Sequence, residues 1–410
     1  MKKMFYVVFL VLSAAVFAGC SDGKSGSVYG SVDYDEEEGT SSEVSDSDTG
    51  KNERPDEAPR PGGGVGNDNG NPNGSSGGTD DEQDLPDEDE TSDDGGETDD
   101  SDGGNTDTDD ENTEKPDENG GEEEGIYALE PDVAECTSGI PSDKDKLKVL
   151  NRLNELRAIH GLPAVVYNTE GDEITAECSL IIAANNIEGG SLQLSHEPPK
   201  SWDCWSQEAY DGCHSSNIHV SWAKNQDISK TDSASIVDGF MIDKNVDSIG
   251  HRRWFLDPWL GHISFGRADY TDGKGTFVIG AAVKVVHDDK PNVSDLKIDF
   301  VAYPFENYPK ELYPGSNIRM SFSVLKDKSN KFNNASGISF GGVAVAIIDS
   351  TSNKTIAVSG LQTDTEGIGI PNNVSWLASG IEYNKKYNVT VRNIVIDNVS
   401  YDYQYWFELK

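Results

Sequence analysis

A long acidic segment, residues 21–125, limits what this chain can fold into more than any other feature. The segment contains 37 Asp or Glu and 5 Lys or Arg, a net charge of −32 out of −41 for the whole chain. Only eight of its side chains are apolar, so the surface that it could bury cannot offset the entropy of ordering it. We therefore expect residues 21–125 to be a disordered tether that charge repulsion extends. Its Asp-rich runs lack the spacing of EF-hand calcium loops, and its charge argues against a nucleic acid as a partner.

The first twenty residues have the features of an export signal. Two lysines precede an unbroken apolar run at residues 5–12, which is shorter than the roughly 20 residues of a transmembrane helix. Small residues then lead into Cys20 in the string Ala-Gly-Cys, which resembles a bacterial lipobox, although Phe17 stands where Leu is usual. The resemblance implies that residues 1–20 are a lipoprotein signal, that Cys20 is acylated, and that a membrane is one partner. Ser21 is compatible with a bacterial outer membrane or cell surface as the destination.

Four further cysteines, Cys136, Cys178, Cys204 and Cys213, follow the tether. An even number of cysteines in an exported chain favours disulfides. Cys204 and Cys213 enclose a short loop and are the natural pair, which leaves Cys136 to pair with Cys178. The other two connectivities remain open.

Residues 126–290 mix helical and strand patterns, and we take them as a first module. Ser142 can cap a helix whose apolar stripe repeats every three residues from Leu147 to Leu156. Further helices are expected at residues 172–187 and 233–243, and strands at residues 264–266 and 276–286.

Residues 297–410 show a different pattern, with short alternating segments separated by Gly, Asn and Pro. Strands are expected at residues 317–324, 343–348, 355–358, 387–391 and 401–409. Such spacing is typical of an antiparallel β-sandwich, in which Trp376 and Trp406 would be core residues. The chain is therefore predicted to be α+β, with a second, all-β module.

Four strings in the first module carry its chemistry. They are Leu-Ser-His-Glu-Pro-Pro at residues 194–199, Ser-Ser-Asn-Ile at 215–218, Val-Asp-Gly-Phe-Met-Ile-Asp at 237–243 and Ile-Gly-His-Arg-Arg-Trp at 249–254. In their order and spacing they resemble the bacterial branch of the CAP superfamily (cysteine-rich secretory proteins, antigen 5 and pathogenesis-related proteins of class 1). The resemblance runs from about residue 147 to 286. It implies a three-layer α-β-α sandwich with a central cleft, followed here by an immunoglobulin-like accessory module.

The resemblance also implies which residues line the cleft. The family's two histidines correspond to His196 and His251, and one of its two acidic residues corresponds to Asp243. Phe240 stands at a tryptophan position. The family's other acidic residue is replaced by Ser216, so the acidic set is incomplete.

Three kinds of chemistry remain open for His196, His251 and Asp243. Two neutral imidazoles and a carboxylate can bind zinc or another divalent metal. The histidines could instead shuttle a proton while Asp243 fixes a tautomer, or the three could form a purely structural cluster. The neighbouring His214 and His219 are predicted to be surface residues.

We expect a lipid-anchored, surface-displayed monomer whose cleft binds a lipid, peptide or glycan without catalysis, because a candidate general base is missing at Ser216. The tether charge should keep neighbouring copies apart. A metal-assisted hydrolase of peptides or cell-wall material is the alternative. A structural adhesin with an inert cleft is the third reading.

Overall fold

The computed structural model describes residues 25–30, 125–188, 192–288 and 291–410, all of which belong to one compact unit. The predicted signal, Cys20 and almost all of the predicted tether lie outside these residues. The described part of the tether includes one strand, β1 (Ser25–Gly30), which pairs with the first module. Among the described residues, no helix is both long enough and apolar enough to cross a membrane.

The first module is organised around a five-stranded sheet with the order β1-β5-β7-β6-β4. Beside β1, its strands are β4 (Val166–Tyr167), β5 (Ser216–Lys224), β6 (His262–Thr271) and β7 (Thr276–Lys284). The short strand β4 runs parallel to β6, and the other pairs are antiparallel. A separate hairpin joins β2 (Tyr127–Leu129) to β3 (Ile140–Pro141).

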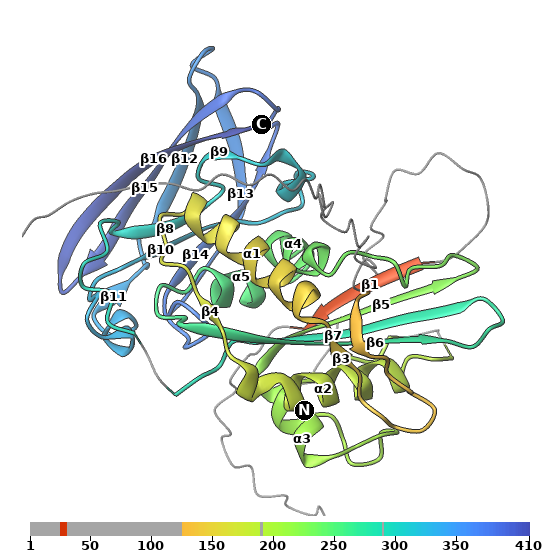
Figure 1. Cartoon of the computed structure of the whole chain (residues 1–410). Coiled ribbons are helices and arrows are strands. Elements are labelled where there is room, and N and C mark those ends of the chain that lie inside the picture. The colour runs from red at the N-terminus through yellow and green to blue at the C-terminus, as the bar shows by residue number, and fades with distance from the viewer. Residues whose placement is uncertain (1–24, 31–124, 189–191, 289–290) are drawn as a thin grey trace, which may run out of the picture. The chain divides into compact units, whose positions relative to one another are not determined.

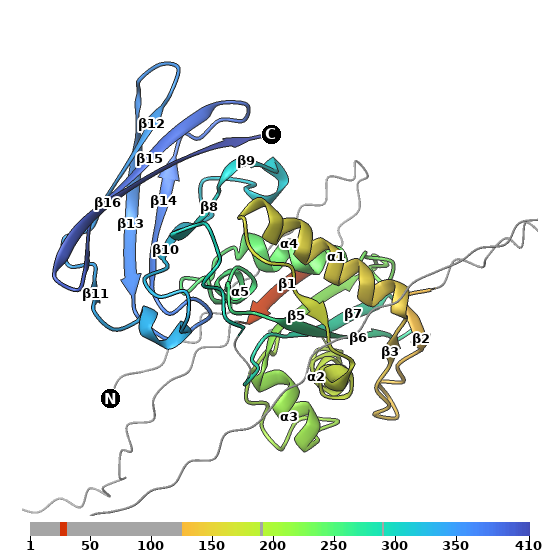
Figure 2. The same ribbon diagram turned by 60° about the vertical axis from the view of Figure 1, so that its left-hand side comes forward.

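Helices cover both faces of this sheet, which gives three layers (Figures 1 and 2). The helices α1 (Asp143–Ile159), α4 (Ala234–Ile242) and α5 (Gly250–Phe255) lie on one face, and α2 (Asp172–Ala184) and α3 (Gln207–His214) on the other. Gly266 and Gly280 let α2 approach the sheet, because a Cβ at either position would come within 2.2 Å of an α2 backbone oxygen. The helices predicted after Ser142 and at residues 172–187 and 233–243 correspond to α1, α2 and α4. The strands predicted at residues 264–266 and 276–286 lie in β6 and β7.

Helix α1 begins as the sequence predicts but turns a different face to the core. The Ser142 hydroxyl accepts a hydrogen bond from the Asp145 amide at 3.2 Å, as an N-cap residue does. The buried stripe consists of Val149, Leu153 and Leu156, at the helical spacing of four and three residues. Leu147 lies away from that stripe and is 51% exposed, so its place in the predicted stripe was wrong.

The C-terminal β region, residues 297–410, is one large sheet of nine strands. Its strands are β8 (Phe300–Tyr303), β9 (Glu306–Tyr308), β10 (Met320–Val324), β11 (Ile338–Ser339), β12 (Ala344–Asp349), β13 (Thr355–Asp364), β14 (Asn373–Ser379), β15 (Lys386–Ile396) and β16 (Val399–Leu409). They follow the order β8-β10-β14-β13-β12-β15-β16-β9, and β11 pairs with β15. All pairs are antiparallel except β9 with β16. Trp376 is fully buried as predicted, but Trp406 is only partly buried, because it lies on the outer side of β16 with the Lys386 ammonium 3.8 Å from its ring.

The first module and the β region share one apolar core. A single cluster of buried side chains includes Leu153 and Phe255 of the first module together with Phe322 and Trp376 of the β region. A second cluster fills the space between the sheet and the helices α2 and α3. The two parts should therefore unfold together.

Candidate functional site

The structure brings two of the three predicted cleft residues together as a hydrogen-bonded pair. Asp243 follows the last residue of α4 in a left-handed conformation (φ 50°), and His251 is the second residue of α5. The imidazole donates from Nδ1 to Oδ1 of Asp243 at 2.7 Å, and Oδ2 accepts from the backbone N–H of Arg252 at 3.2 Å. Both side chains are fully buried. The carboxylate therefore orients the imidazole and joins the end of α4 to the start of α5.

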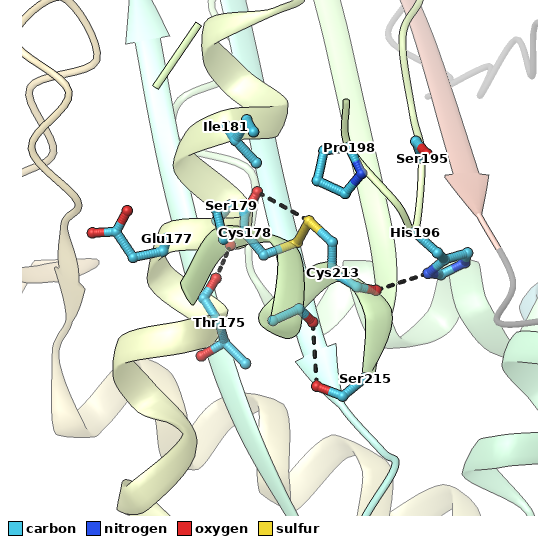
Figure 3. Close-up of a disulfide and its surroundings, with 12 residues drawn as sticks. Thr175, Glu177, Cys178, Ser179, Ile181, Ser195, His196, Pro198, Cys213 and Ser215 are labelled. Atoms are coloured by element: carbon cyan, nitrogen blue, oxygen red, sulfur yellow. Dashed lines mark hydrogen bonds between the residues drawn. A yellow bond between two sulfur atoms is a disulfide. The ribbon is translucent and has the colours of Figure 1, made fainter. Parts of the chain in front are cut away.

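The third predicted residue, His196, contacts a different element. Its loop passes beside the end of α3, where the imidazole Nδ1 donates to the Cys213 carbonyl oxygen at 2.8 Å (Figure 3). His196 is partly buried, whereas His251 is fully buried. Within the part of the chain that the structure describes, no three His, Cys, Asp or Glu side chains converge to form a metal site.

The string at residues 215–218 starts strand β5, and its polar members are buried. The Ser216 hydroxyl is fully buried and has no hydrogen-bond partner among the described residues. The neighbouring Asn217 donates from its amide to the His251 carbonyl oxygen at 3.2 Å. Ser216, at the position of the family's other acidic residue, therefore offers a neutral hydroxyl. The amide of the next residue, Asn217, bonds to the backbone of α5.

His219 is a buried neighbour of this site, so its prediction as a surface residue was wrong. It lies on β5, which is covered on both faces, and is 3% exposed. A hydrogen bond of 2.7 Å joins its Nε2 to the Ser221 hydroxyl, and the edge of its ring meets the Phe240 ring. Burial, reinforced by the positive charge of Arg267, lowers the pKa of His219 to about 3. Residues 216–220 include only two apolar side chains, Ile218 and Val220, so no local pattern in the sequence indicated this burial.

All four cysteines form disulfides, but the predicted pairing was wrong. Cys136 bonds to Cys204, and Cys178 bonds to Cys213. Cys204 precedes α3 and Cys213 lies near the end of that helix, so the rise of about 1.5 Å per helical residue keeps the two cysteines apart. That helix packs against α2, where Gly212 meets the Ile174 backbone so closely that a Cβ would lie 1.9 Å from its oxygen. This contact places Cys213 beside Cys178 (Figure 3).

Arg252 and Arg253, which follow His251, form hydrogen bonds and an ion pair with the β region. Arg252 is buried and donates hydrogen bonds of 2.7 Å to the carbonyl oxygens of Met241, Ile242 and Arg319. Its guanidinium also stacks 3.6 Å from the centre of the Tyr303 ring. Arg253 pairs with Asp364 at 2.9 Å. The short helix α5 therefore carries one cleft residue and two residues that attach the β region.

Two surface pockets lie outside the buried pair. One has a volume of about 370 Å³ and lies between residues 197–200 and helix α3, with Trp205, Gln207 and Tyr210 on its walls. The other has about 400 Å³ and lies on the β region beside Tyr313 and Tyr383. The first pocket begins at Glu197, the residue that follows the predicted cleft residue His196 in the sequence.

The family comparison agrees with this arrangement. A sequence model of the cysteine-rich secretory protein family, CAP, matches residues 150–281. This range includes His196, Asp243 and His251, and it ends within β7. No curated protein matches the chain in a sequence search. Residues 150–281 therefore form a domain of the CAP superfamily.

Proposed function

We propose that this chain is a lipid-anchored CAP protein of the cell surface that acts by binding a ligand and not by catalysis. The CAP domain and the two disulfides indicate an extracellular protein. The acylated Cys20 would supply the membrane anchor, and stable attachment requires more than one acyl chain. The β region, whose nine strands form one connected sheet and not the two sheets of the predicted immunoglobulin-like sandwich, would be an accessory module.

The observation that carries this proposal is the burial of the Asp243–His251 pair. A general base has to come within hydrogen-bond reach of the proton that it removes, and both side chains are fully covered. Both carboxylate oxygens already accept hydrogen bonds. At the position of the missing glutamate, Ser216 offers only a buried hydroxyl.

The accessible chemistry lies nearby, on the outside of the domain. The pocket at residues 197–200 and α3 opens to solvent and has aromatic walls, which are common features of ligand sites. Ligand binding at this pocket requires no change in the buried pair.

A metal-assisted hydrolase is the second candidate, and one observation favours it. The 2.7 Å hydrogen bond from His251 to Asp243 is the arrangement in which a carboxylate orients a catalytic imidazole. Opening of the cleft would expose that imidazole. In the third reading, an adhesin, neither the pair nor the pocket would bind anything.

Calorimetry with zinc separates the first two readings. We would titrate Zn²⁺ into the purified full-length protein, its His196→Ala variant and its His251→Asn variant, which retains a hydrogen-bond donor near Asp243. We expect no zinc affinity that depends on both histidines, and no cleavage of a peptide library or of cell-wall fragments. Zinc binding that both variants abolish, together with cleavage, would establish the hydrolase instead.

The anchor is tested independently. We expect the mass of the N-terminal peptide from the exported protein to include acyl chains on Cys20. The Cys20→Ser variant should lose that mass and leave the membrane fraction. A Cys20→Ser protein that remains in the membrane fraction would contradict the anchor.

A further inference from the structure

We propose, building on the binding function above, that the pocket between residues 197–200 and helix α3 binds one pyranose unit of a glycan. Its volume of about 370 Å³ lies at the lower end of the range for small-molecule sites. The pocket is bounded by side chains that come from two neighbouring segments of the chain, the loop after His196 and the first turns of α3.

The walls of the pocket match the flat faces of a sugar ring. Trp205 and Tyr210 contribute aromatic rings, and the exposed Pro199 contributes one more rigid ring, whereas Pro198 is buried. The C–H groups on the face of a pyranose pack on such surfaces, and aromatic side chains provide large contact areas at low entropic cost. No Leu, Ile, Val or Met side chain lines this pocket in the described part of the chain, so it lacks the aliphatic lining that an acyl chain would need.

The polar groups at the rim match a neutral, hydroxyl-rich ligand. Glu197 offers a carboxylate, Gln207 an amide and Lys200 an ammonium group. The positive and negative charges balance, and Glu197 is 67% exposed, so the rim does not favour a phosphate or another anion. Hydroxyl groups, which both donate and accept, can bond to all three side chains.

One face of the Trp205 ring is available to such a ligand. The Lys200 ammonium lies 5.0 Å from the centre of that ring, and Lys200 itself is exposed. A flexible, solvated side chain therefore covers the ring face beneath Lys200. A sugar ring can occupy this position when that side chain swings aside.

The pocket is held in place before any ligand arrives. The Trp205 indole N–H donates to the Pro198 carbonyl oxygen at 3.1 Å, which joins the two walls. Disulfides fix both ends of the wall that carries α3, through Cys204 at its start and Cys213 near its end. A preformed site avoids the entropic cost of ordering loops on binding.

Calorimetric titration of the purified full-length protein tests the proposal with three probes. They are a β-1,4-linked N-acetylglucosamine tetramer, a β-1,4-linked glucose tetramer and a proline-rich decapeptide. We expect saturable binding of at least one tetramer, weakened at least tenfold in Trp205→Ala and less in Trp205→Phe, which keeps a flat ring. Trp406→Ala is the matched control, because Trp406 is also partly buried beneath a lysine, and it should bind as the unmodified protein does.

Each other outcome is decisive. Binding of the decapeptide alone, lost in Trp205→Ala, overturns the glycan and leaves the binding function intact. Tetramer binding that Trp205→Ala leaves unchanged, in a variant with an unaltered melting temperature, overturns the assignment to this pocket, and so does failure of all three probes to bind. Cleavage of a tetramer that depends on Trp205 supports the glycan pocket but overturns the proposal of binding without catalysis.

Discussion

The buried ion pair between Lys331 and Asp257 provides a quantitative test of how the two parts of the chain are joined. Asp257 follows helix α5 of the CAP domain, and Lys331 begins a 3-10 turn of the β region (Lys331–Asn334). Their side chains are 4% and 2% exposed, and Nζ lies 2.5 Å from Oδ2. The ammonium also lies 4.6 Å from the centre of the Trp254 ring. The Lys331→Met variant removes the charge and keeps most of the buried stem.

The expected cost follows from the carboxylate that remains. In Lys331→Met, Oδ1 of Asp257 still accepts from the Trp259 amide at 2.9 Å, but Oδ2 loses its partner in a buried environment. Breaking a buried pair in this way costs about 3–5 kcal/mol. With an unfolding entropy of about 2.1 cal/mol/K per residue, the roughly 285 residues after the tether give about 0.6 kcal/mol/K. The melting temperature should therefore fall by about 5–8 °C.

The assay is thermal and urea unfolding followed by circular dichroism and tryptophan fluorescence. The Asp257→Asn/Lys331→Met double variant should recover at least half of the lost stability, because no buried charge remains. Lys328→Met is the control, since Lys328 pairs with a 75% exposed Asp299, and it should cost less than about 1 kcal/mol. A loss below about 1 kcal/mol in Lys331→Met would refute the reasoning. Two separate transitions in the unmodified protein would refute the shared core.

Three further predictions concern pH, disulfides and the edge strand. Burial lowers the pKa of His160 and of His219 to about 3, below the usual 6.5, so the unfolded state binds more protons between these values. Stability should therefore fall as the pH drops below 6.5, by about 1.4 kcal/mol per pH unit and histidine, and melting curves of the two His→Gln variants should show a flatter dependence. Replacing both Cys178 and Cys213 by Ala opens a loop closed over a separation of 35 residues and should cost about 4 kcal/mol in urea unfolding. Deleting residues 21–30 removes the partner of strand β5, so hydrogen exchange should accelerate at the outer edge of β5 and stay unchanged on β7.

Local patterns in the sequence predicted the helices α1, α2 and α4 and the strands β6 and β7 of the first module, but not α3, α5, β4 or β5. Ser142 and the apolar spacing specified α1, and four short strings located His196, Asp243 and His251 within a known family. These signals depend on neighbours within a few residues, so they survive without knowledge of the tertiary structure. The same strings assigned Asp243 and His251 to one cleft but left open whether the two side chains form a hydrogen bond.

Features that depend on packing between distant segments could not be predicted in this way. The pairing of Cys178 with Cys213 depends on how α2 packs against α3. Loop length suggested a different pair because it takes no account of helix α3, which begins after Cys204 and contains Cys213. The strand at residues 25–30 lies in a segment whose average composition predicted no structure, although the two residues Val28 and Tyr29 are good strand formers.

Helix α5 couples the CAP domain to the β region. His251 belongs to the buried pair, while the next residue, Arg252, donates to the Arg319 carbonyl oxygen of the β region. Gly369 of the β region has a φ of +56° and approaches the Arg253 backbone so closely that a Cβ would lie 2.3 Å away. A Cβ at Gly369 would push the β region away from α5. The Arg252 amide of α5 donates to the Asp243 carboxylate, so a shift of α5 would strain this hydrogen bond. The geometry of the His251–Asp243 pair therefore depends on the β region, which acts as part of the support of the site.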